Sequence, residues 1–191
     1  AVNHPEQRWL DAAILSSAAD LCVPVIDQVV AMREANRGND AILEQLAACI
    51  GARRKAAEVD ALLVTVAASD DQEATVSLLD GLIVGLQRGE STRLLPPGVE
   101  HQLRTLVSSP SAQVRLRGLR VAKLLQLDQT PAMRELWEAG QKTALDMESR
   151  LEERVAATEI LANAPGEQRR RMGKELDVRE TQQLQLRAVE A

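Results

Sequence analysis

Apolar residues recur along this chain with the spacing of an α-helix, and some segments are apolar on two sides. Residues 149–166 read SRLEERVAATEILANAPG. On a helical wheel Leu151, Val155 and Ala162 share one narrow face. A second, wider face consists of Ala156, Ala157, Ile160, Leu161 and Ala164. A helix on an ordinary core needs one apolar stripe, so two faces predict neighbouring helices on two sides.

Similar patterns run through the rest of the sequence and predict an all-α protein of about eleven helices without a strand. Some starts carry recognisable signals: Asp70 and Asp71 precede QEATVSLL, and Pro131 suits a first helical turn. The predicted helices cover residues 6–19, 23–35, 40–51, 56–68, 72–87, 98–108, 112–126, 131–146, 149–163, 167–176 and 180–191.

A short motif recurs along these helices: an apolar residue, any residue, a small residue, then an apolar or small one. Its copies begin at Leu10, Leu116, Val155 and Leu186, with a looser copy at Val76. Helix pairs that repeat every 30–47 residues or so are typical of an α-solenoid. We therefore predict a right-handed solenoid of about five helical hairpins and a truncated sixth. The small third residue lets neighbouring backbones approach closely.

The segment VRLRGLRVAKLL (114–125) strengthens this prediction, because its apolar residues surround the whole wheel. Its four basic residues, Arg115, Arg117, Arg120 and Lys123, are then expected to reach water from a mostly enclosed helix. The alternative architecture is an ordinary helical bundle.

Composition excludes some classes of function. Hydrophobic residues make up 45% of the chain, which is enough for a sizeable core, and Phe and Tyr are absent. The formal charge of −5 argues against a nucleic-acid-binding protein, which normally carries a basic surface. The longest apolar run, near LLDGLIVGL (78–86), is far too short to cross a membrane.

Several segments resemble a known family of repeats. RVAATEILANAP (154–165) and DVRETQQLQLRAVEA (177–191) look like the HEAT-like repeats of large exported haem proteins of planctomycetes, and RWLDAAILSSA (8–18) and TVSLLDGLIVGL (75–86) fit the same pattern. In that family a dehydrogenase-like propeller precedes the repeats and a cytochrome c domain with a CxxCH motif follows them. The resemblance implies that residues 1–191 form a single HEAT-like repeat domain of a longer, exported or periplasmic protein; without it, a cytoplasmic location is expected.

Residues that could carry chemistry are few and scattered. His4 and His101 are isolated in the sequence, and no CxxC, CxxCH or glycine-rich phosphate loop is present. We therefore predict no catalytic residue, no metal site and no cofactor. Cys22 and Cys49 would lie at similar heights on antiparallel helices, so a disulfide is one interpretation. The favoured alternative is a pair of small buried thiols.

Two further features have a binding interpretation and a plainer one. Trp9 and Trp137 could anchor an interaction, although a single Trp on a repeat helix more often fills the core. The basic clusters Arg53-Arg54-Lys55 and 168–174 could contact DNA, as in HEAT-like DNA glycosylases. Acidic neighbours and scarce aromatic residues favour solvated helix ends instead.

The expected function is therefore a non-catalytic scaffold or protein-interaction domain. Its partners would be other domains of the same polypeptide or another protein, with no nucleic acid and no membrane insertion. The resemblance suggests that it spaces a propeller dehydrogenase-like domain from a cytochrome c domain. The alternative is a HEAT-like DNA glycosylase or other DNA-binding enzyme, and a third hypothesis is a lyase or chaperone for a pigment or cofactor.

Overall fold

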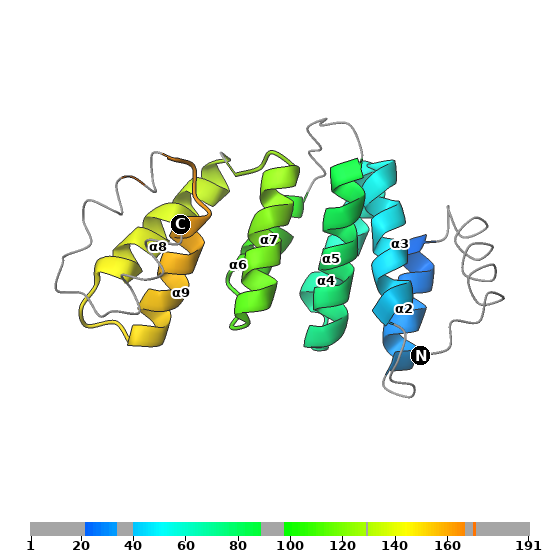
Figure 1. Cartoon of the computed structure of the whole chain (residues 1–191), viewed down its shortest axis with the longest axis horizontal. Coiled ribbons are helices and arrows are strands. Elements are labelled where there is room, and N and C mark those ends of the chain that lie inside the picture. Colours follow the sequence, from blue (N-terminus) through cyan, green and yellow to red (C-terminus); the bar gives the residue numbers. More distant parts are fainter. Residues whose placement is uncertain (1–21, 34–39, 89–97, 129, 167–169, 171–191) are drawn as a thin grey trace. The chain divides into compact units, whose positions relative to one another are not determined.

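The computed structural model describes residues 22–33, 40–88, 98–128, 130–166 and 170, and these are helical without a strand (Figure 1). Short turns join consecutive helices wherever the connection is described. The helices are α2 (Cys22–Arg33), α3 (Asp40–Arg53), α4 (Ala56–Ala68), α5 (Gln72–Arg88), α6 (Val99–Val107), α7 (Ala112–Leu124), α8 (Pro131–Leu145) and α9 (Leu151–Ala162).

The all-α prediction is confirmed for this part of the chain, and each predicted helix within it is found to within a few residues. The largest differences lie at helix ends. For example, α7 stops at Leu124 rather than 126 because Gln126 adopts a left-handed backbone with φ of 58°. The Leu127 amide then donates to the Ala122 carbonyl, a hydrogen bond that closes the last turn. The helices predicted at 6–19, 167–176 and 180–191 lie wholly or largely outside the described residues.

Two predicted start signals act as expected. The carboxylate of Asp71 accepts a hydrogen bond from the Ala74 amide at 3.0 Å, one turn into α5. Thr130 caps α8 by accepting from the Met133 amide at 3.4 Å, and Pro131 occupies the first turn. Local polar residues therefore set where these helices begin.

The chain divides into two compact units, residues 1–102 and 103–191. The boundary falls inside α6, between Gln102 and Leu103. The single continuous repeat domain predicted for residues 1–191 stays a prediction.

The first unit is built on the packing of α3 against α5, which lie side by side (Figure 1). Helices α2 and α4 also contact each other, and α4 contacts α3 and α5. Leucine and isoleucine supply the large side chains of this core. Its large, fully buried side chains are Ile26, Leu43, Leu46, Ile50, Leu62, Leu63, Leu78, Leu79, Leu82 and Leu86.

Three glycines bring α3 and α5 unusually close. A Cβ atom at Gly81 would lie 2.7 Å from the carbonyl carbon of Glu44 and closer still to its oxygen. A Cβ at Gly85 would overlap the Ala48 carbonyl, and one at Gly51 would lie 2.6 Å from the Leu82 oxygen. In all three cases the nearest atoms belong to backbone, which cannot rotate away. This crossing therefore requires glycine.

The basic cluster at residues 53–55 is engaged at helix ends, in keeping with the plainer of its two interpretations. Arg54, with φ of 50°, follows α3 and donates from Nη2 to the Leu86 carbonyl near the end of α5, at 2.8 Å. Arg53 and Lys55 pair with Glu58 at 3.1 and 3.3 Å. These cations satisfy carbonyl and carboxylate groups of their own unit.

In the second unit, α9 contacts both α8 and α7. The prediction that its apolar faces are covered by neighbours is confirmed for the wide face only. The wide apolar face supplies the buried Ala157, Leu161 and Ala164. The narrow face is more open, and Leu151 is 41% exposed. Arg154 is also buried, and its Nε donates to the Ala144 carbonyl near the end of α8 at 3.1 Å. This bond fixes α9 to its neighbour.

Gly118 of the repeated motif behaves as predicted, because α7 lies close to α6 there. A Cβ at this position would stand 3.1 Å from the Cβ of Leu106 and 3.3 Å from a methyl carbon of Val107. Within the described ranges, none of the helices combines the length and the apolar content that crossing a membrane requires.

Candidate functional site

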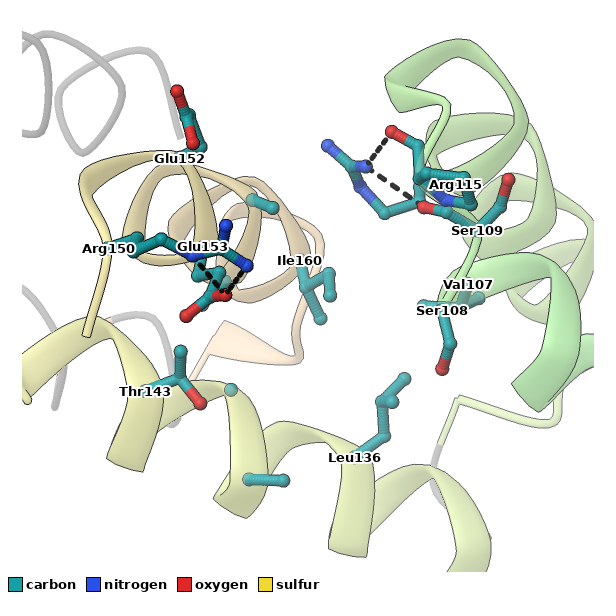
Figure 2. A pocket seen from close by; sticks show the side chains of 15 residues that line it. Val107, Ser108, Ser109, Arg115, Leu136, Thr143, Arg150, Glu152, Glu153 and Ile160 are labelled. Carbon is teal, nitrogen blue, oxygen red and sulfur yellow. Dashed lines mark hydrogen bonds and ion pairs between the residues drawn. The ribbon is translucent and has the colours of Figure 1, made fainter.

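A groove of about 590 Å³ lies within the second unit (Figure 2). Its walls are the α6–α7 connection at 107–110, one face of α8 and one face of α9. The lining residues are Val107, Ser108, Ser109, Pro110, Arg115, Leu136, Ala139, Gly140, Thr143, Arg150, Glu152, Glu153, Ala156, Ala157 and Ile160. The volume falls in the range of pockets that hold a small molecule or a few side chains of a peptide.

Small side chains on α8 and α9 leave this space open. Ala139 and Gly140 lie on the α8 wall, and Ala156 and Ala157 on the α9 wall. Packing does not require glycine at position 140, since a Cβ there would meet its nearest neighbours at 3.7 Å, an ordinary van der Waals distance. Leu136 and Ile160 point toward the space from the two helices (Figure 2). The groove therefore has a largely aliphatic floor.

Arg115 lies at one end of the groove (Figure 2) and belongs to a buried ion pair. Arg115 donates from Nη2 to the Glu159 carboxylate at 2.8 Å, and the two side chains are only 10% and 11% exposed. Its Nη1 donates to the carbonyl oxygens of Ser109 and Pro110 at 3.0 and 2.9 Å (Figure 2). One guanidinium thus ties the α6–α7 connection and the start of α7 to α9. The prediction that Arg115 reaches water is wrong, because this pairing lets the charge stay buried.

The opposite end carries an exposed ion pair at the start of α9. Arg150 donates from Nε and Nη2 to one oxygen of Glu153, at 2.9 and 2.6 Å. This hydrogen bond and the carboxylate charge raise the pKa of Arg150 above its ordinary value. Glu152 and Glu153 occupy the first turn of α9, where negative charges complement the helix dipole. Such a pair is solvated, so it contributes little to stability.

Asp146 shapes the turn that leads into this wall. Its carboxylate accepts a hydrogen bond from the Ser149 hydroxyl at 2.8 Å and another from the Glu148 amide at 3.0 Å. These bonds, the Ser149 one first, lower the pKa of Asp146 below its ordinary value of 3.8. The ionised carboxylate therefore stabilises the turn before α9.

Replacing Asp146 with alanine is expected to lower the melting temperature near neutral pH, and the difference from wild type is expected to shrink in acid. Because the folded-state pKa is lowered, the stabilisation is complete above the unfolded value of 3.8 and is lost as the pH falls through the folded pKa. Thermal melts of both proteins across this range measure the effect. A difference that is independent of pH would show that the carboxylate charge is not involved.

The chemistry of the groove suits binding of an apolar group. Two of its charged residues, Arg115 and Arg150, already pair with a carboxylate. Its uncharged polar side chains are the hydroxyls of Ser108, Ser109 and Thr143. Among the described residues that line it, no histidine or cysteine accompanies these hydroxyls. No group of three or more His, Cys, Asp or Glu residues in the described part is placed to hold a metal ion.

The residues singled out from the sequence have different surroundings in the structure. Trp137 is 2% exposed and donates from Nε1 to the Asp128 carbonyl at 3.1 Å, so it is a core residue and cannot serve as a surface anchor. Cys49 is a partly exposed thiol, and the disulfide with Cys22 stays a prediction. The side chain of Cys22, and all of Trp9 and His4, lie outside the described part, while His101 is exposed on α6.

Sequence reasoning did not identify the groove or its ion pair. Arg115 and Glu159 are 44 residues apart, and nothing in a single sequence links them. The sequence gives only a weak indication of the groove, which is a pair of adjacent small residues at 139–140 and another at 156–157, on two consecutive predicted helices.

Comparison with protein-family models, curated proteins and solved structures found no match.

Proposed function

We propose that this chain is a non-catalytic helical-repeat domain that acts by binding a segment of another protein or of a neighbouring domain. Contacts between alternate helices support the repeat architecture. In the first unit α2 contacts α4 and α3 contacts α5, and in the second unit α7 contacts α9. Stacked hairpins of an α-solenoid bring alternate helices together in this way. The solenoid of HEAT-like hairpins is part of this proposal.

The groove between 107–110, α8 and α9 is the observation that carries the binding role. An aliphatic floor of this size accommodates a few apolar side chains of a peptide, and its polar edge can hydrogen-bond to a peptide backbone. The buried Arg115–Glu159 pair holds the walls in place without a ligand, which reduces the entropy lost on binding.

The resemblance to repeats of exported haem proteins gives this role a setting. The domain would hold a propeller dehydrogenase-like domain at a fixed distance from a cytochrome c domain. In that setting the groove would receive an apolar segment from one of those domains, and the redox chemistry would belong to them.

A selection of displayed random peptides against the purified chain tests the groove. We expect apolar peptides whose affinity, measured by fluorescence anisotropy, falls at least about tenfold in Ala139→Glu, because this change places a charge on the floor. Ala139 is exposed, so the fold is expected to persist. Ala57→Glu makes the same change at an exposed position on α4 and should leave binding intact. Peptides that bind both variants equally would overturn the proposal.

Duplex DNA separates this function from the DNA glycosylase alternative. We expect the chain to cause no electrophoretic shift of duplex DNA at low salt, and we expect the DNA not to compete with peptide binding. A tight, salt-sensitive shift would favour the enzyme.

A further inference from the structure

The exposed face of α7 is basic, although the whole chain is acidic. The helix carries Arg115, Arg117, Arg120 and Lys123 and no acidic residue, within a chain of net charge −5. Arg115 turns inward to Glu159, so three basic residues remain toward the surface. Among the described residues, no carboxylate forms an ion pair with Arg120 or Lys123. Within the described ranges, the positive charges of Arg120 and Lys123 are therefore not neutralised by an ion pair.

These residues form a continuous surface on one side of the helix. Gln113, Leu116, Arg117, Arg120 and Lys123 fall within roughly a third of its circumference and span about 15 Å along its axis. We call these five residues the α7 basic face. Leu116 is 42% exposed and lies among the cations, and Gln113 and Lys123 are exposed at the two ends. The face therefore combines positive charge with one apolar contact point.

We propose that the α7 basic face docks an acidic segment of a partner protein, a segment that carries an apolar side chain among its carboxylates. Charge complementarity selects the carboxylates, since Arg120 and Lys123 have no carboxylate partner in the part of the chain that the structure describes. The exposed Leu116 selects against a phosphate backbone, which offers no apolar group to cover it. The length of the face matches two to three turns of a bound helix, roughly the reach of carboxylates at i, i+4 and i+7. This inference rests on the proposed interaction role but uses a surface separate from the groove.

The probe is a fluorescein-labelled peptide with glutamates at helical spacing around a central leucine, titrated against the full chain by anisotropy at low salt. We expect saturable binding that weakens with salt and is lost when the glutamates become glutamines. Arg120→Glu and Lys123→Glu should each weaken binding about tenfold, because an attraction becomes a repulsion. Leu116→Ser should weaken it about threefold through lost apolar burial.

Arg134→Glu is the matched control, since it makes the same change in charge at an exposed position on α8. Binding that falls equally in Arg134→Glu would reflect net charge only and would overturn the proposal. No binding of the glutamate peptide would overturn it too. Tighter binding of duplex DNA that ignores Leu116→Ser would assign the face to a nucleic acid instead. Ala139→Glu should leave this peptide bound, so failure of the groove and failure of the α7 basic face are distinguishable.

Discussion

Replacing Gly81 with alanine is expected to destabilise the first unit by at least about 2 kcal/mol and to loosen the contact between α3 and α5. The added methyl would lie 2.7 Å from the carbonyl carbon of Glu44 and closer to its oxygen. Both atoms are backbone, so relief requires the two helices to move apart. Such a movement would disturb the close contacts of Gly51 and Gly85 along the same crossing.

Two opposing effects set the size of this result. Alanine favours the helical state over glycine by about 1 kcal/mol, which stabilises α5 in isolation. Overpacking a rigid contact costs about 1–3 kcal/mol and exceeds this where backbone must move. The clash at Gly81 involves three backbone atoms of Glu44, all within 2.9 Å. The steric effect therefore dominates.

Gly140→Ala is the matched control, because the same substitution meets its nearest atoms only at 3.7 Å. At that position only the higher helix propensity of alanine acts, and the free energy of unfolding is expected to rise by up to about 1 kcal/mol. Circular dichroism melts give the overall stability, and amide hydrogen exchange in α3 and α5 localises the change. A Gly81→Ala protein as stable as Gly140→Ala would mean that the two helices do not approach this closely.

The helices themselves could be predicted because their signals are local. Apolar periodicity, the Asp71 cap and Pro131 each act over a few residues, and each is found in the structure. Gly118 could be predicted as a close approach because the repeated motif places a small residue there. The close approach of α3 and α5 was not predicted, even though DGLIVGL (80–86) contains two glycines four residues apart. Spacing alone does not say which helix they face.

The candidate site could not be predicted because it depends on contacts between distant residues. The sequence indicates that Arg115 is charged on an apolar helix, and snorkelling to water is then the simplest expectation. Only the fold brings Glu159 within 2.8 Å and the two carbonyls of 109–110 within 3.0 Å. Trp137 is a similar case, since the Asp128 carbonyl that accepts its indole N–H lies in the turn before α8.

Replacing Arg115 with alanine is expected to destabilise the second unit by about 3 kcal/mol or more. The substitution leaves the Glu159 carboxylate, 11% exposed, without its guanidinium partner, and it removes the donors to the Ser109 and Pro110 carbonyls. Inside a protein, a carboxylate that loses this guanidinium keeps its desolvation penalty and loses the attraction that the guanidinium supplied. Urea denaturation followed by Trp137 fluorescence measures the effect, with Trp9 replaced by phenylalanine so that one indole reports.

Two comparisons separate burial from pairing as the cause. Arg150→Ala breaks an ion pair whose side chains are 79% and 47% exposed, and it should cost far less stability than Arg115→Ala. The double substitution Arg115→Met, Glu159→Leu removes both charges and should recover much of the loss, because apolar side chains of similar size can replace a buried pair. An Arg115→Ala protein no less stable than Arg150→Ala would contradict the burial of this pair. Failure of the double variant to recover would assign the stabilisation to the 109–110 carbonyls, and the guanidinium would then act mainly by fixing the groove wall.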